Sequence, residues 1–305
     1  MINDKFIVVA GPCSAESFEQ LHDTVMELSQ IKQIDLIRCG AWKPRSLPGG
    51  FQGAGEKALE WIRQIKSENP SFKFAIEVAL PHQAELALQY DIDALWVGAR
   101  TVSNPFSVQE LASALKGASI PVMIKNPIAP DIKMWIGAIE RFQRAGLPLL
   151  YAVHRGFSTL SPYGLRNAPL WTIPLELKKI MPEIPLLCDP SHLCGDASLI
   201  EPFAKDAVLL GFDGIMVESH NHPDQALTDA KQQLTPSKLN RILFEIEALT
   251  KNVDLYDWDK VILKERIEIL ENEQSIISSE LEKARIKYHE YLNKSEKLAQ
   301  PIQQP

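Results

Sequence analysis

The chain has 305 residues, 45% of them hydrophobic and 23% charged, and a formal net charge of −7. That length accommodates one barrel of about 200–250 residues plus an appendage, and the negative charge argues against nucleic acid or an anionic membrane as a partner. No apolar stretch is long enough for a membrane span or a secretory signal. We therefore expect a cytoplasmic protein with no nucleic-acid and no membrane partner.

Eight short apolar runs without polar alternation recur along the chain, as is typical of strands buried on both faces of a parallel sheet. They lie at residues 6–10, 35–38, 74–78, 94–98, 121–125, 149–153, 185–189 and 214–218. Helical patterns separate most of them, which predicts an α/β fold, a (β/α)8 TIM barrel. A doubly wound open sheet is the alternative, but it would usually carry a glycine-rich phosphate loop after its first strand. The segment GPCSAE at 11–16 is not such a loop.

Charged or metal-binding side chains lie at, or just after, the C-terminal ends of all eight predicted strands. In chain order they are Cys13 and Glu16; Arg38, Lys43 and Arg45; Glu77; Arg100; Lys125; His154 and Arg155; Asp189 and His192; and Glu218 and His220. Barrel enzymes build their active sites on this face. One such residue could be a surface charge, but eight in phase predict a barrel enzyme with a polar site.

Positive charge dominates this set. The cations are Arg38, Lys43, Arg45, Arg100, Lys125 and Arg155. Because cations crowded into one pocket repel each other, the arrangement favours strongly anionic ligands such as phosphates and carboxylates. In the segment 43–46, Pro44 stiffens the loop between two cations and the Ser46 hydroxyl can donate to a phosphate oxygen. For any single arginine, a surface or structural ion pair explains the residue equally well.

The remaining candidates form a mixed donor set: Cys13, His192, Glu218 and the later acid Asp229. A thiolate, an imidazole and two carboxylates suit a divalent transition metal such as Mn²⁺, Fe²⁺, Co²⁺ or Zn²⁺. The residues come from separate loops, so their spacing leaves acid–base or structural roles open, and a buried apolar role is the common one for a cysteine. The competing ligand candidates are His154, His220 and His222.

Ten short segments taken together resemble the 3-deoxy-D-arabino-heptulosonate 7-phosphate (DAHP) synthases. In chain order they are GPCSAES, IRCGAWKPRS, GGFQGAG, IEV, GART, IKNP, HRGFS, CDPSH, MVESH and ALTDAKQQ. The resemblance covers about residues 5–236 and is greatest to the type I β-subfamily, the kind found fused to chorismate mutase. It implies condensation of phosphoenolpyruvate with erythrose 4-phosphate, the entry step of the shikimate pathway to aromatic amino acids.

The resemblance also implies roles for individual residues. The metal ligands would be Cys13, His192, Glu218 and Asp229, with Mn²⁺ the first choice of metal and Fe²⁺, Co²⁺ or Zn²⁺ the others. Phosphoenolpyruvate would be held by Arg100, Lys125 and Arg155, with Arg38 and Lys43 beside its phosphate or carboxylate and His154 counted among the substrate-binding residues. Erythrose 4-phosphate would be received by Lys43, Pro44, Arg45 and Ser46. Catalytic roles are expected for Lys43, Cys13, His192, Glu77 and Asp229. Glu77 would help to place the attacking water, and Lys43 and a metal-bound water are the two candidates for proton transfer.

Two other functions remain alternatives. The related 3-deoxy-D-manno-octulosonate 8-phosphate synthases use arabinose 5-phosphate and typically show KANRS where this chain has KPRS at 43–46. The shorter loop favours the four-carbon aldehyde. A non-catalytic barrel that binds phosphate ligands and acts as a subunit or sensor is the second alternative, although the full set of cations and ligands argues against it.

The composition changes near residue 236, so we expect a catalytic barrel at 1–236 and a helical extension at 237–305. Within the extension, residues at alternating spacings of four and three form a heptad stripe. They are Leu263, Ile267, Leu270, Gln274, Ile277, Leu281, Ala284 and Tyr288. A single helix of this length cannot bury its stripe alone. It must pack on the barrel or pair with another chain, and we expect a homodimer or homotetramer that forms through this helix.

Relatives carry a three-helix chorismate mutase domain here, whose first helix bears spaced cations. Arg266, Lys283 and Lys294 fall at similar spacing. Because the chain ends before a second or third helix, we expect a degenerate or truncated mutase-like helix, and a solvated helix face explains the three cations. A bifunctional synthase–mutase is the alternative. No extension precedes the first strand, so we expect any regulation to act through the C-terminal helix or through partners.

Overall fold

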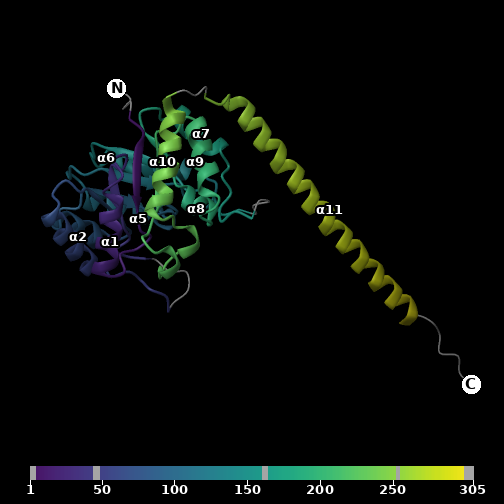
Figure 1. The fold of residues 1–305 in the computed structure, drawn as a ribbon. Coiled ribbons are helices and arrows are strands. Elements are labelled where there is room, and N and C mark those ends of the chain that lie inside the picture. The colour runs from purple at the N-terminus through teal and green to yellow at the C-terminus, as the bar shows by residue number, and fades with distance from the viewer. Residues whose placement is uncertain (1–4, 44–48, 160–163, 252–254, 299–305) are drawn as a thin grey trace, which may run out of the picture. The chain divides into compact units, whose positions relative to one another are not determined.

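The computed structural model describes residues 5–43, 49–159, 164–251 and 255–298, with side chains described as far as residue 289. It divides into two compact units, Met1–Trp258 and Asp259–Pro305, which are described separately below. The division falls later than the expected domain boundary at residue 236. The reason is that helix α10 (Pro236–Lys251) packs against α1 and α9 of the first unit (Figure 1).

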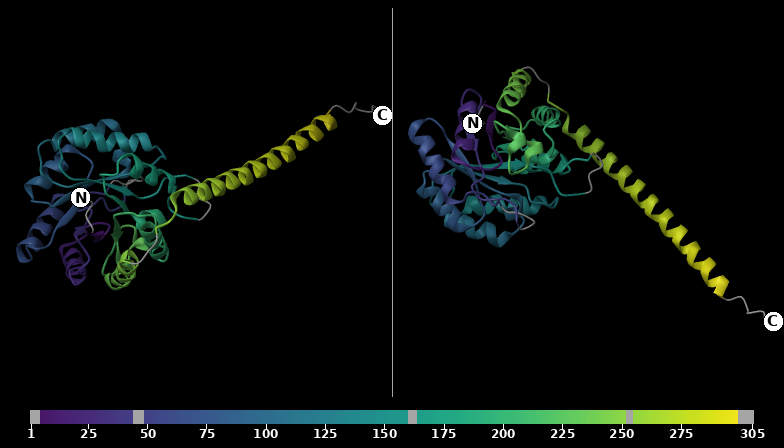
Figure 2. Two further views of the ribbon diagram at one scale, coloured as in Figure 1. Left: turned by 90° about the horizontal axis from the view of Figure 1, so that it is seen from above. Right: turned by 60° about the horizontal axis from the view of Figure 1, so that its bottom comes forward.

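The first unit is a closed barrel of eight parallel strands in sequential order. The strands are β1 (Ile7–Gly11), β2 (Leu36–Arg38), β3 (Phe74–Val78), β4 (Ala94–Val97), β5 (Val122–Lys125), β6 (Leu150–His154), β7 (Leu186–Cys188) and β8 (Gly214–Glu218). Pairing of β1 with β8 closes the barrel, with Ile7 opposite Gly214 and Gly11 opposite Glu218. The predicted TIM barrel with a C-terminal helical extension is confirmed, and helices surround the strands (Figure 2).

Helices alternate with the strands. They are α1 (Phe18–Leu28), α2 (Glu56–Glu68), α3 (Pro81–Gln89), α4 (Ala99–Val102), α5 (Pro105–Ala114), α6 (Ile132–Arg144), α7 (Thr172–Ile180), α8 (Pro190–Cys194) and α9 (Ile200–Leu209), with short 3-10 turns η1 (Pro223–Gln225) and η2 (Ala230–Gln232). Side-chain caps begin several of them: Ser17 accepts from the backbone N–H of Gln20, and Asp131 from that of Met134. The short helices α4 and α8 begin directly after β4 and β7, which places them on the C-terminal face of the barrel.

The barrel interior is filled by side chains from alternate strand positions. They include Val9, Ala75, Ala94, Trp96, Met123, Val153, Leu187 and Met216, all of them buried. The opposite side of each strand packs against helices, so the strands are buried on both faces and read as continuous apolar runs. This alternation matters for the site, because the residue that follows an inward-facing residue in a strand points to the helical layer.

The second unit consists mainly of helix α11 (Trp258–Leu298), one continuous helix of 41 residues (Figure 1). Its described side chains carry the predicted heptad stripe. Among the described helices, none combines the length and the apolar content needed to cross a membrane.

Candidate active site

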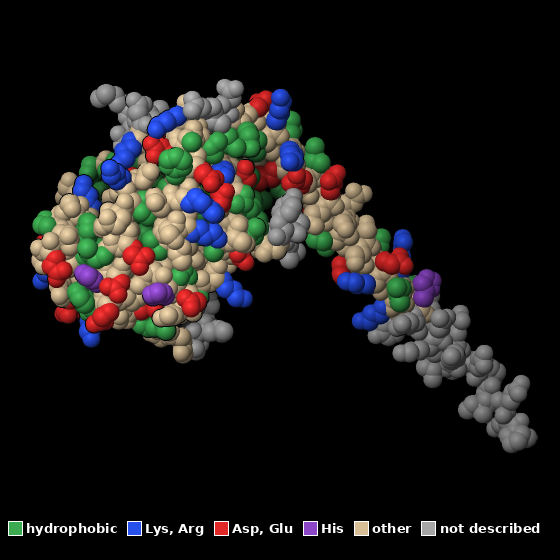
Figure 3. Space-filling view, viewed as in Figure 1, with side chains coloured by type: hydrophobic (Ala, Val, Ile, Leu, Met, Phe, Trp, Pro, Cys, Tyr) green, Lys and Arg blue, Asp and Glu red, His purple; other side chains and the backbone are tan. Residues whose placement is uncertain are grey.

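A cavity of about 850 Å³ opens at the C-terminal ends of the strands. Its charged lining consists of Lys43, Arg100, Lys125, Arg155 and Arg166 against Glu77 and Asp229, with His192 beside them. On the barrel face seen in Figure 3, in contrast, acidic and basic side chains are interspersed over the surface. With five cations against two carboxylates, the cavity lining carries an excess of positive charge, which suits a small, strongly anionic ligand.

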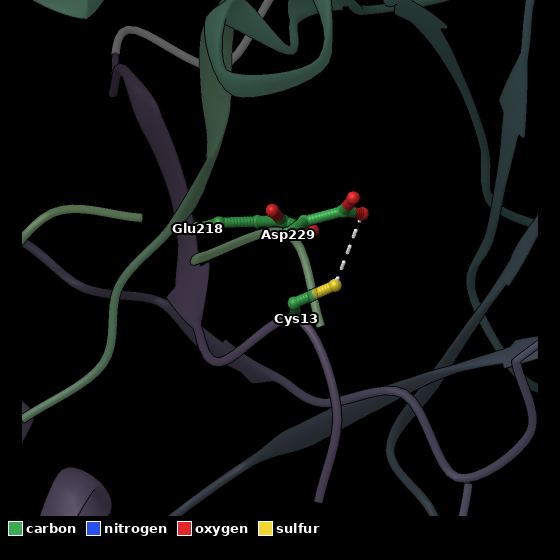
Figure 4. Close-up of side chains that lie close together, drawn as sticks. All are labelled: Cys13, Glu218 and Asp229. Carbon is green, nitrogen blue, oxygen red and sulfur yellow. Dashed lines mark hydrogen bonds between the residues drawn. The ribbon is translucent and has the colours of Figure 1, made fainter. Parts of the chain in front are cut away.

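Three of the four predicted metal ligands lie together at this cavity. The ligand atoms of Cys13, Glu218 and Asp229 are all within 4.8 Å of one another, and Cys13 Sγ is 3.4 Å from Asp229 Oδ2 (Figure 4). Cys13 follows β1, Glu218 ends β8 and Asp229 precedes η2, so the closure of the barrel between β1 and β8 brings them together. Asp229 has a φ of 45°, a left-handed conformation that aspartate tolerates better than most residues.

His192, the fourth predicted ligand, lies beside this group. Its Nε2 is 3.7 Å from Glu218 Oε1, and its Nδ1 is 2.8 Å from Asp189 Oδ2. Burial lowers the pKa of His192 although the Asp189 carboxylate opposes the shift, which favours the neutral ring. A neutral imidazole that keeps its proton on Nδ1, next to a carboxylate, presents the lone pair of Nε2 to a metal.

The donor set fits a divalent cation. Cys13 and Glu218 are fully buried, and burial together with the charge of Glu218 raises the pKa of the Cys13 thiol to about 12. Three groups that become negative at such close range repel each other unless a cation lies between them. A bound metal supplies that charge and turns the thiol into a thiolate ligand.

Two buried ion pairs lie next to the ligand cluster. Arg38 Nη2 donates to Glu218 Oε1 at 3.0 Å, and Lys125 Nζ to Asp189 Oδ2 at 2.7 Å. Arg38 also lies over the Trp96 ring, 4.9 Å from its centroid. Among the described residues, its Nε and Nη1 have no hydrogen-bond partner although they are buried. Unused buried donors of this kind are what an anionic ligand would satisfy.

Glu77 also lines the cavity. Trp96 Nε1 donates to its Oε2 at 3.1 Å. A Cβ atom on Gly98 would lie only 2.2 Å from Glu77 Oε1, so the carboxylate occupies space that only glycine leaves free. The sequence predicted Glu77 as a site residue, and the structure places it in the cavity lining.

Arg155 is positioned by two asparagines. Its backbone N–H donates to Asn126 Oδ1 at 2.7 Å, and its Nη1 donates to Asn167 Oδ1 at 2.8 Å. Burial lowers its pKa to about 10, and the charges of Arg166 and Arg100 add to this shift. The cavity thus holds more positive charge than its own carboxylates neutralise, which is the electrostatic requirement for binding an anion.

Three described histidine candidates are absent from the cavity lining: His220 and His222, the competing ligand candidates, and His154. Val153 before it faces the barrel core, so His154 points to the helical layer. There its ring packs between Trp135, Phe157, Trp171 and Phe212. Direct substrate contact, expected from the sequence, does not fit this position. Pro44, Arg45 and Ser46 lie outside the described residues.

Sequence reasoning missed the pair Arg166–Asn167, in the loop after β6. Arg166 Nη1 lies 3.3 Å from Asp229 Oδ1 and also donates to Gln232, whose Nε2 in turn donates to Glu218 Oε2 at 2.6 Å. Asn167 holds Arg155 and donates to the carbonyl of His192 at 2.7 Å. One dipeptide therefore contacts both the ligand cluster and the cation group. The sequence does show Arg166 as a cation in the loop after the sixth strand, and this position at the C-terminal face of the barrel could have identified it as a site residue.

The sequence matches the DAHP synthetase I family over residues 2–254. It is 31% identical over 250 residues to a phospho-2-dehydro-3-deoxyheptonate aldolase of Thermotoga maritima, which covers 81% of this chain and 70% of that protein. A 2-dehydro-3-deoxyphosphooctonate aldolase of Wolinella succinogenes is 24% identical over 270 residues, covering 80% and 99% of the two chains.

Solved structures show the same relationship. A crystal structure of the Thermotoga maritima DAHP synthase superimposes with a TM-score of 0.72 at 29% identity, covering 82% of this chain and 70% of that one. A truncated form of the same enzyme gives a TM-score of 0.68 at 27% identity, covering 82% and 88%. The barrel, the cationic cavity and these matches agree, and the chain belongs to the DAHP synthetase I family.

Proposed function

We propose that this protein is a DAHP synthase, which condenses phosphoenolpyruvate with D-erythrose 4-phosphate and water to give DAHP and phosphate. The observation that carries the proposal is the convergence of five cations and a thiol–carboxylate cluster on one cavity. Both substrates are phosphates, and phosphoenolpyruvate also carries a carboxylate, so the charges of the cavity and its ligands are complementary.

Each substrate has a matching part of the cavity. Arg100, Lys125 and Arg155 would hold phosphoenolpyruvate, and Lys125 and Arg155 are kept in place by Asp189 and Asn167. Lys43 lies next to Cys13 and begins the segment 43–46, which we propose as the site for erythrose 4-phosphate. Arg38 would also bind phosphoenolpyruvate, through the Nε and Nη1 donors that it does not use for Glu218.

The chemistry follows from this arrangement. A divalent metal held by Cys13, His192, Glu218 and Asp229 would act as a Lewis acid that polarises the aldehyde. C3 of phosphoenolpyruvate then attacks the aldehyde carbon, while the surrounding cations stabilise the charge that develops. Water oriented by Glu77 adds at C2, and loss of phosphate leaves the keto acid. Lys43 would give a proton to the former aldehyde oxygen, a role supported by the 3.0 Å distance between its ammonium and Cys13 Sγ.

We propose Mn²⁺ as the metal, with Fe²⁺, Co²⁺ and Zn²⁺ as competitors, because the mixed donor set accommodates each of them. The test is phosphoenolpyruvate consumption with erythrose 4-phosphate, before and after chelation, followed by re-addition of each metal. Activity should vanish with the chelator and return best with Mn²⁺. Full activity in the chelated, metal-free protein would contradict a metal-dependent reaction.

A matched assay with arabinose 5-phosphate separates the two aldehyde specificities. Relatives that act as octulosonate aldolases match at 24% identity, so faster turnover of the five-carbon sugar would reassign the substrate. Absence of phosphoenolpyruvate consumption with either aldehyde and every metal would favour the non-catalytic barrel.

Finer assignments are part of the same proposal. We assign the protein to the type I β-subfamily found fused to chorismate mutase, with a catalytic domain at 1–236, since all candidate site residues lie there.

Arg266 and Lys283 are exposed on α11, and the side chain of Lys294 lies outside the described residues. We expect no conversion of chorismate to prephenate, and its detection would make the protein bifunctional.

A cytoplasmic location is supported by four buried cysteines without disulfides.

A further inference from the structure

The apolar stripe of α11 is exposed in the second compact unit. The aliphatic side chains Leu263, Ile267, Leu270, Ile277 and Leu281 are 46–66% exposed, and Tyr288 is 63% exposed. The stripe spans more than three heptads. An exposed apolar row of this length on a charged helix marks an interaction surface.

The heptad register assigns each residue a position. Taking Ile267, Gln274, Leu281 and Tyr288 as a, the d positions are Leu263, Leu270, Ile277 and Ala284. The flanking e positions are Lys264, Glu271, Ser278 and Arg285, and the g positions are Arg266, Glu273, Glu280 and Lys287. Positive charge therefore lies at both ends of the stripe and negative charge in its middle.

We propose that α11 forms a parallel, in-register, two-stranded coiled coil with α11 of a second copy of this chain. In a parallel pair, each g residue faces the e residue five positions later in the partner. Arg266 then faces Glu271 and Glu280 faces Arg285, and Glu273 faces the neutral Ser278. By two-fold symmetry each attractive pair occurs twice.

The antiparallel pair that overlaps the whole stripe has the opposite charge balance. It brings Arg266 opposite Lys287 and Glu273 opposite Glu280 along the g rows, and Lys264 opposite Arg285 along the e rows. All three are like-charge contacts. Charge complementarity therefore favours the parallel orientation.

The polar core residue favours the same orientation and register. In the parallel pair Gln274 packs against Gln274 of the other chain, where the two side-chain amides can hydrogen-bond. In the fully overlapped antiparallel pair it would face Ile277, and a buried amide without a partner is costly. A single polar a residue is a known way to fix register and strand number.

Cysteine cross-linking of the full-length protein tests the orientation. Leu263→Cys and Tyr288→Cys place a thiol at either end of the stripe, and the four native cysteines are buried. A parallel pair predicts that each variant, oxidised alone, gives a disulfide-linked dimer. Cross-links that appear only when the two variants are mixed would overturn the proposal in favour of an antiparallel pair.

Two further variant sets test the interface itself. Ile277→Asp should halve the particle mass measured by light scattering for the 34.2 kDa chain, whereas Ser279→Asp, at an outer f position, should not. Glu280→Arg should weaken association, and adding Arg285→Glu should restore it, because the reversed pair is again attractive. An unchanged mass for Ile277→Asp, or no rescue in the double variant, would refute the interface. These measurements do not depend on catalytic activity, so they fail or succeed separately from the proposed function.

Discussion

Lys43 and Cys13 are in direct contact: Lys43 Nζ lies 3.0 Å from Cys13 Sγ and 3.2 Å from the Cys13 carbonyl oxygen. Burial works against the charge of this ammonium, but Cys13, Glu218 and Glu77 outweigh it and raise the pKa of Lys43. The ammonium of Lys43 therefore lies between the proposed aldehyde-binding segment and the proposed metal ligands. The proposed aldehyde-binding segment and the proposed ligand Cys13 are adjacent because β1 and β2 are paired neighbours in the barrel.

Cys13→Ala should remove the soft ligand from the cluster. Removal of an outer partner of a metal ligand costs about 10–100-fold in metal affinity. Because Cys13 is proposed as a ligand itself, we expect the affinity for Mn²⁺ to fall by more than about 100-fold, with turnover lost in parallel. Equilibrium metal binding by dialysis, measured without substrates, checks this. Cys39→Ala is the matched control, since Cys39 is also buried but is not in the cluster. Unchanged metal content in the Cys13 variant would remove Cys13 from the ligand set.

Arg166→Gln should act through Asp229 and Gln232 rather than on substrate directly. We expect metal affinity to fall by about 10–100-fold, while the unfolding temperature hardly changes, because Arg166 is partly exposed. Arg166→Lys should recover part of the affinity. Arg144→Gln, on the exposed surface of α6, serves as the control. A wild-type metal affinity in Arg166→Gln would show that the ion pair with Asp229 has no positioning role.

Gly98→Ala should displace the Glu77 carboxylate, because the added Cβ would meet Glu77 Oε1 at 2.2 Å. Misplacing a catalytic group by this order of distance costs about 100-fold in rate. The effect should appear in kcat more than in KM for phosphoenolpyruvate, since Glu77 is proposed to place water. Gly137→Ala in α6 is the control, as its Cβ would meet only the flexible end of Arg141. Unaltered kcat in Gly98→Ala would argue against a role for Glu77.

His154 should make stability depend on pH. Burial among aromatic rings lowers its pKa to about 3, so the folded protein keeps the ring neutral while the unfolded chain takes up a proton below about pH 6.5. Stability is therefore full above pH 6.5 and falls as the pH decreases, by about 2 kcal/mol from this group at pH 5.

Urea unfolding at pH 7 and pH 5 measures this contribution. His154→Gln should lose about 2 kcal/mol less than the native protein over that interval. The exposed His82 provides the control substitution, His82→Gln. An identical pH response in His154→Gln and the native protein would show that His154 is not buried in its neutral form.

The sequence alone determined the barrel, because each strand is buried on both faces and so appears as a continuous apolar run. It also determined the face of the site, since every strand of a parallel barrel delivers its C-terminal residues to one end. For this reason Glu77, Lys125 and Arg155 could be selected from their positions at or just after the C-terminal ends of strands. The heptad stripe of α11 followed in the same way from side-chain periodicity.

Only the tertiary structure decided which of these side chains meet. Val153 and His154 are neighbours in the chain, yet Val153 fills the barrel interior and His154 packs against Trp135 in the helical layer. In a strand buried on both faces, composition does not show which residues face inward and which face the helices. Arg166 reaches Asp229 from a distant loop, a contact between residues far apart in sequence. The extension of the first unit beyond residue 236 depends on packing of α10 against α1 and α9. Local sequence fixes periodicity and strand ends, whereas the meeting of separate loops depends on how the closed barrel brings them together.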